Sequence, residues 1–107
     1  RLTVAMMFGQ SNDLFYAPGP EAIALFDAKG KPLTIDITSQ LQLWDAGTEI
    51  NEEPGLGPNQ AARQPAPNTG PGEHGNVMLV KDQFHYPSVR EVVRVSVKPS
   101  MATAAAK

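Results

Sequence analysis

The chain has 107 residues and a formal net charge of −2, from 9 Lys and Arg against 11 Asp and Glu. This length suits one small domain, and the near-neutral charge excludes the basic surface that nucleic-acid binding requires. The chain has no cysteine, which excludes disulfides and thiolate metal sites, and no apolar run approaches the roughly 20 residues that span a bilayer, so no transmembrane segment is expected.

Apolar or alternating segments bounded by turn-forming residues predict about six strands. They cover residues 2–8, 22–26, 33–37, 41–44, 77–80 and 93–97. Residues 14–17 are a further apolar segment, between a polar turn and a Pro-Gly-Pro break. Residues 20–25 also suit a one-turn helix, because Pro followed by Glu is typical of a helix start. We favour the strand, because the turn at residues 27–30 then forms a hairpin connection to the next strand.

The middle of the chain has no periodic pattern. Five Pro and five Gly lie between Pro54 and Gly75, and so long a stretch without periodicity predicts a functional or mobile loop over residues 50–76. The Ala-rich end of the chain, residues 99–107, is only about two turns long and predicts a flexible tail. All the predicted strands therefore belong to one domain over residues 1–98.

These elements predict an all-β fold, an antiparallel β-sandwich. Without the loop and the tail about 70 residues remain, fewer than the roughly 100 of a typical seven-stranded sandwich. We therefore expect an incomplete sandwich. Its remaining strands, from a missing N-terminal half or from a partner, would pair with the exposed edges.

Carboxylates gather in the turns of this sequence. Asp13 lies in a polar turn, Asp45 follows a predicted strand, and Glu49 lies just beyond it. Gly47 permits a tight turn that folds Asp45 and Glu49 back on one point, and Ca²⁺ accepts about six to eight oxygen ligands in irregular loops. Spacing alone favours an ordinary β-turn with solvated carboxylates, and the EF-hand pattern is not met.

Other chemistries have weaker support. His74 and His85 have no third imidazole or thiolate partner, so a zinc site is not expected. Ser88, His85 and Asp82 are too close in sequence to favour the geometry of a catalytic triad. A metal-dependent hydrolase would need a general base and an open metal position, which nothing beyond the acidic cluster supports. We therefore predict that the chain is not an enzyme.

Several segments resemble the spondin domain, the N-terminal module of F-spondin and mindin that also occurs in secreted bacterial proteins. The most specific segment is Trp-Asp-Ala-Gly-Thr-Glu at residues 44–49, together with Ser-Asn-Asp-Leu-Phe at residues 11–15. The other matching segments are residues 51–54, the Gly/Pro-rich loop, and residues 84–87 and 92–97. The resemblance covers roughly residues 2–97 and corresponds to the C-terminal half of the domain.

The resemblance implies a β-sandwich similar to the synaptotagmin-type calcium- and lipid-binding domains, with one Ca²⁺ held by acidic loops. The ligands of the family fall on Asp13, Asp45 and Glu49 of this chain, and the last of these is Asp in the animal proteins. Glu52 and Glu53 have no clear counterpart in the animal pattern and are considered only as further contributors.

We therefore expect a secreted protein, extracellular or periplasmic, that binds Ca²⁺ and takes part in adhesion without catalysis. The ion would tie two loops together, and it would either rigidify them or bind a carboxylate of a partner. The alternative is a structural subunit of a surface or extracellular assembly that joins other chains through its exposed strand edges. The expected partner is another protein, the missing N-terminal half of the domain, or further copies of the chain.

Overall fold

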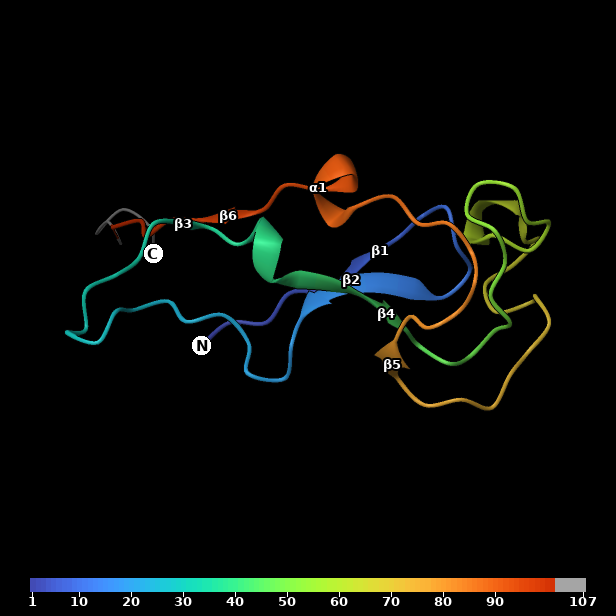
Figure 1. Cartoon of the computed structure of the whole chain (residues 1–107), viewed down its shortest axis with the longest axis horizontal. Coiled ribbons are helices and arrows are strands. Elements are labelled where there is room, and N and C mark those ends of the chain that lie inside the picture. The colour runs from blue at the N-terminus through green and yellow to red at the C-terminus, as the bar shows by residue number, and fades with distance from the viewer. Residues whose placement is uncertain (102–107) are drawn as a thin grey trace.

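The computed structural model describes residues 1–101, which form short antiparallel strands joined by long loops (Figure 1). The strands are β1 (Met6–Met7), β2 (Leu14–Pro18), β3 (Ile35–Asp36), β4 (Leu41–Asp45), β5 (Met78–Leu79) and β6 (Ser96–Val97). The helical turns among these residues are η1 (Thr38–Gln40), η2 (Ala61–Arg63) and α1 (Val89–Val92). A search of residues 1–101 for a helix of the length and apolarity that a membrane span needs finds none.

The larger sheet has the strand order β1-β2-β4-β5, and every pair is antiparallel. Its centre is the pair of β2 and β4, which have five residues each and pair along their whole length, from Leu14 opposite Asp45 to Pro18 opposite Leu41. Pro18 closes β2, since proline has no N–H to continue the ladder. The edges of the sheet are the two-residue strands β1 and β5.

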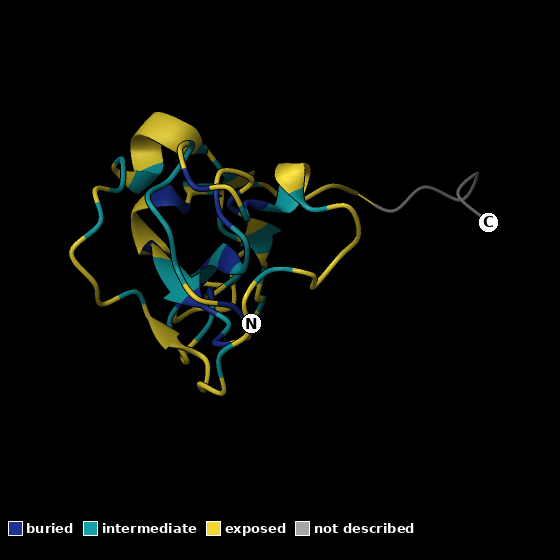
Figure 2. Ribbon diagram, turned by 90° about the vertical axis from the view of Figure 1, so that its right-hand side faces the viewer, coloured by how far each residue is buried: buried dark blue, intermediate teal, exposed yellow. Residues whose placement is uncertain are grey.

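Successive residues of these strands point to opposite faces of the larger sheet. Tyr16, opposite Met6 and Leu43, lies in the core with Phe8 and Leu14. The residues that pack against this core from the C-terminal part of the chain are Val80, Tyr86, Val89 and Val93. Figure 2 shows the buried residues in the interior, with exposed loops around them.

The residues next to this core row along the strands are also apolar, and they point to the opposite face of the sheet. They form a row across all four strands through Met7, Phe15, Trp44 and Leu79. Met7 is 55% exposed and Leu79 is 44% exposed. The larger sheet therefore has one covered face and one open apolar face, on which the central Phe15 and Trp44 are half-buried.

The smaller sheet pairs β3 with β6, with Ile35 opposite Val97. The pairing continues past β3, where the N–H of the buried Ile37 donates to the carbonyl of Val95 (2.8 Å). Helix α1 begins with a capping box formed by Ser88 and Glu91. It contacts both η1 and β4, and so connects the C-terminal strand to the larger sheet.

The all-β prediction is confirmed, because the described residues form antiparallel strands with almost no helix. The predicted strand at residues 22–26 makes only isolated bridges, Leu2 to Ile23 and Phe26 to Pro32, and the alternative helix at residues 20–25 does not form. The apolar run reflects burial, but its backbone bonds join it to its neighbours only at single positions, such as Ile23 with Leu2, and form no continuous ladder. Conversely, residues 14–17, noted only as apolar, lie in the central strand β2. The predicted tail at 99–107 lies outside the described residues from position 102 onward.

Candidate metal centre

Strand pairing brings Asp13 and Asp45 together at one end of the larger sheet. Asp13 directly precedes β2, and Asp45 is the last residue of β4. Because the strands are antiparallel, Leu14 lies opposite Asp45, and the N–H of Ala46 donates to the carbonyl of Asp13 (3.1 Å). Asp45 is only 8% exposed. Two of the three predicted ligands are therefore neighbours because of the strand register.

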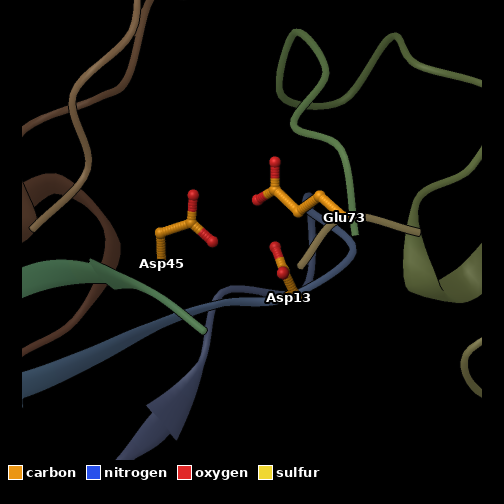
Figure 3. A group of neighbouring side chains, drawn as sticks. All are labelled: Asp13, Asp45 and Glu73. Carbon is orange, nitrogen blue, oxygen red and sulfur yellow. The ribbon is translucent and has the colours of Figure 1, made fainter. Parts of the chain in front are cut away.

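Glu73 completes the acidic group from the long loop. The loop returns along the turn after β4, where the N–H of Glu73 donates to the carbonyl of Thr48 (3.1 Å) and the N–H of Gly75 to that of Gly47 (3.0 Å). One carboxylate oxygen each from Glu73 and the two aspartates lie within 4.8 Å of one another. In Figure 3 the three carboxylates point toward a common space. Glu73 is not among the ligands predicted from the sequence, because no local pattern connects it to residues so far back in the chain.

The two oxygens of the Asp13 carboxylate have different roles. Its Oδ2 accepts hydrogen bonds from the Thr48 N–H (2.8 Å), the Thr48 hydroxyl (3.1 Å) and the Glu49 N–H (2.9 Å). Its Oδ1 is buried and has no hydrogen-bond partner in the described structure. Buried polar atoms are normally paired, so this oxygen is suited to an additional ligand such as a cation.

The Asp45 carboxylate is held by the turn that follows it. Oδ1 accepts from the Gly47 N–H (2.7 Å), and Oδ2 accepts from Nδ2 of Asn51 (2.8 Å). The same Nδ2 lies 3.1 Å from Oδ2 of Asp82, which also accepts from the Tyr86 hydroxyl (2.8 Å). The Oδ1 of Asn51 is buried and has no partner within residues 1–101. Asn51 meets Asp45 and Asp82 through its Nδ2, so its side chain holds these two carboxylates in place.

The acidic group adjoins an open groove of about 430 Å³. The polar side chains that line it are those of Asp45, Asn51, Glu73, Asn76, Lys81, Asp82 and Gln83. Burial raises the pKa of the Glu73 carboxyl, and the negative charges of Asp45 and Asp13 raise it further. The carboxylates therefore repel one another when no cation is bound.

Protonation of Glu73 is expected to stabilise the cation-free protein. The pKa of Glu73 is higher in the folded chain than its ordinary value of 4.5, so the folded state binds this proton more tightly. The stabilisation is fully present below the ordinary pKa and is lost as pH rises through the raised one. Glu73→Gln keeps this side chain neutral at every pH and should therefore remove the pH dependence, which urea unfolding in metal-free buffer at several pH values would measure.

The control for this experiment is Glu21→Gln, the same change at an exposed carboxylate. The difference in unfolding free energy between wild type and Glu73→Gln should grow as pH rises from the ordinary pKa toward neutrality. A difference that does not vary with pH would contradict the role given to Glu73.

Glu49, the third predicted ligand, lies outside the acidic group. It is 3% exposed, and its two carboxylate oxygens both lie 3.0 Å from Nε2 of Gln64. Oε1 also accepts from the Gly70 N–H (2.8 Å). Glu49 thus faces the long loop, and Glu73 occupies the place expected for it. The sequence places Glu49 close to Asp45 but does not show which way its longer side chain turns.

Glu52 and Glu53, considered as further contributors, are also outside the group. Glu52 accepts from the N–H and Nδ2 of Asn59 (2.8 and 2.9 Å), and Glu53 accepts from the His85 N–H (3.2 Å). The segment predicted as a loop over residues 50–76 is therefore internally hydrogen-bonded and contains the 3-10 turn η2. Glu52 therefore organises the loop itself, whereas Glu53 joins the loop to His85.

Comparison of the chain with protein-family models, with curated proteins and with solved structures finds no match.

Proposed function

We propose that this chain is a secreted, non-enzymatic calcium-binding β-sandwich domain used for adhesion or extracellular interaction, as the resemblance to the spondin domain implies. Asp13, Asp45 and Glu73 hold the ion. The ion ties the start of β2, the turn after β4 and the long loop into one unit. It also presents an open coordination position toward the groove.

The observation that carries this proposal is the convergence of three carboxylates from three separate segments. Within residues 1–101 the ion pairs are Arg90 with Asp36 and His85 with Glu53, so no Lys or Arg forms an ion pair with the group, although Lys81 lines the adjoining groove. The free Oδ1 of Asp13 adds to this. Partly buried like charges are unfavourable without a counter-ion, and a bound cation would reverse that repulsion.

The donor chemistry favours Ca²⁺ over other metals. The group offers only carboxylate oxygens, and no imidazole or thiolate belongs to it. Zinc and the later transition metals prefer nitrogen and sulfur ligands. Irregular loops can adjust to the long, variable coordination distances of Ca²⁺ more easily than to the strict octahedron of Mg²⁺.

The proposed partner is a further set of strands that would complete the sandwich. The radius of gyration is 17.0 Å, against about 13 Å for a compact chain of this length. The accessible surface is 7459 Å², against roughly 5,800 Å² expected for a folded monomer of this mass. The larger sheet also has an open apolar face, with Met7 and Leu79 exposed at its two edges. A partner sheet that packed on it would give the two layers of a sandwich.

The alternative proposal is a structural subunit of a surface or extracellular assembly. It is favoured by the open face and by the unpaired edges at β1 and β5, which are templates for strand addition. In this alternative, copies of the chain associate in chelator as well as in calcium.

A calcium titration of the metal-free chain by isothermal calorimetry tests the leading proposal. Wild type is expected to bind one Ca²⁺, and Asp13→Asn is expected to bind at least about tenfold more weakly, since a charge and a ligand are lost. Sedimentation velocity on the same samples separates the alternative. Association that is independent of calcium, without a binding isotherm, would favour the assembly subunit.

A further inference from the structure

We propose that Glu49 is a positioning residue, which fixes the long loop so that Glu73 reaches the cation, and that Glu49 does not itself bind the ion. The inference rests on the proposed calcium site and assigns a different role to a carboxylate that the sequence pattern groups with the ligands. Glu49, Gln64 and Gly70 together are called the Glu49 clamp below.

The clamp is a buried carboxylate surrounded by N–H donors. Glu49 receives the side-chain amide of Gln64 on both oxygens and the backbone N–H of Gly70 on one. The same amide nitrogen of Gln64 also donates to the Asn59 carbonyl (2.7 Å), while its Oε1 accepts from the Thr69 N–H (3.1 Å). Hydrogen bonds to a buried charged group are among the stronger ones in proteins, so the clamp organises both sides of the loop.

Backbone contacts carry this order from the clamp to Glu73. The Ile50 N–H donates to the carbonyl of Pro71 (2.9 Å), and Glu49 forms an isolated antiparallel bridge with Gly72. Glu73 follows directly and is bonded to Thr48. Glu73, the third member of the acidic group with Asp13 and Asp45, therefore lies at the end of a short backbone ladder that begins at the Glu49 clamp.

Gly70 supplies a way to disturb the clamp without changing any carboxylate. A Cβ at this position would lie 2.8 Å from Oε1 of Glu49 and 2.9 Å from Nε2 of Gln64. Such contacts are shorter than van der Waals distances, so Gly70→Ala would push the two side chains apart. Glu49→Gln should also weaken the clamp, because it removes the negative charge of the carboxylate that accepts three hydrogen bonds.

The Arg63–Gln64 peptide bond reports the order of the loop independently of calcium. The guanidinium of Arg63 donates to the carbonyls of Gly55 (3.2 Å), Leu56 (3.0 Å) and Gly57 (2.7 Å). Trypsin needs the Arg side chain released and the local backbone opened, so cleavage at this bond measures local opening of the loop.

The experiment combines trypsin cleavage in chelator, with the Arg63 cut followed by mass spectrometry, and calcium titration of the same proteins. Glu49→Gln and Gly70→Ala are each expected to raise the cleavage rate at Arg63 by about tenfold and to weaken calcium binding by about tenfold. Glu73→Gln is expected to weaken calcium binding at least as strongly and to leave cleavage in chelator unchanged. Glu21→Gln serves as the charge-matched control and should change neither quantity.

If Glu49→Gln were cleaved at Arg63 at the wild-type rate but bound calcium as weakly as Glu73→Gln, the proposal would be overturned and Glu49 would be a ligand. Unchanged cleavage and calcium binding in Gly70→Ala would overturn it as well. A wild-type chain that binds no calcium would contradict the proposed function instead, and the cleavage measurements would still decide whether Glu49 orders the loop.

Discussion

Saturating Ca²⁺ is expected to raise the melting temperature of this chain by about 10 °C or more, and Asp45→Asn is expected to abolish that increase. A ligand that binds only the folded state stabilises it by about 2.7 kcal/mol at a hundredfold excess over Kd. In a domain of about 100 residues each kcal/mol corresponds to roughly 4–8 °C. Asp45 is central to the site because it is 8% exposed and ends β4. The measurement is a thermal melt in calcium and in chelator.

Asn is the most selective replacement for Asp45, because it removes the charge and preserves the shape of the side chain. Its Oδ1 can still accept the Gly47 N–H that now donates to Asp45 (2.7 Å), so the turn keeps its bond while the charge is lost. Asp27→Asn is the matched control, since Asp27 also accepts backbone N–H groups in a turn, from Lys29 (2.8 Å) and Lys31 (2.9 Å). It should keep the full calcium shift. An equal shift in wild type and Asp45→Asn would remove Asp45 from the site.

Gly47→Ala is expected to destabilise the chain by about 2–4 kcal/mol and to weaken calcium binding. Gly47 has φ of 77°, a left-handed conformation that costs a residue with a Cβ about 1 kcal/mol. The added Cβ would also lie 2.6 Å from the carbonyl carbon of Gly75 and 2.8 Å from the carbonyl oxygen of Asn76. Both are backbone atoms, so residues 75–76 would have to move. That movement would also displace the adjacent Glu73. Urea unfolding and calcium titration measure the two effects.

Gly30→Ala separates the two causes of this destabilisation. Gly30 also has a positive φ, 80°, but a Cβ there would meet no atom within 4 Å. It should therefore show the conformational cost alone and leave calcium binding intact. If Gly47→Ala were no more destabilising than Gly30→Ala, the close approach of residues 75–76 to Gly47 would be contradicted.

The sequence by itself determined the all-β class and the neighbourhood of Asp13 and Asp45. Alternating and β-branched segments report burial on one side of a strand, which is a local property. Both aspartates lie next to strands, β2 and β4, so one pairing between those strands is enough to bring them together. The strand predicted at residues 22–26 is wrong because its apolar residues report only burial. Ile23 is buried, yet its backbone forms only an isolated bridge.

Only the tertiary structure decided which carboxylate completes the acidic group. Glu49 and Glu73 are both acidic residues beside turns, and nothing local distinguishes a cation ligand from a loop anchor. The difference comes from Gln64 and Gly70, whose N–H groups occupy the oxygens of Glu49, and from the backbone bond between Glu73 and Thr48. These contacts join residues far apart in the chain, and their formation depends on the path of the whole loop over residues 50–76. A hydrogen-bond donor can satisfy a buried carboxylate from any point in the sequence, so the composition of a turn does not show whether its carboxylate remains free to bind a metal.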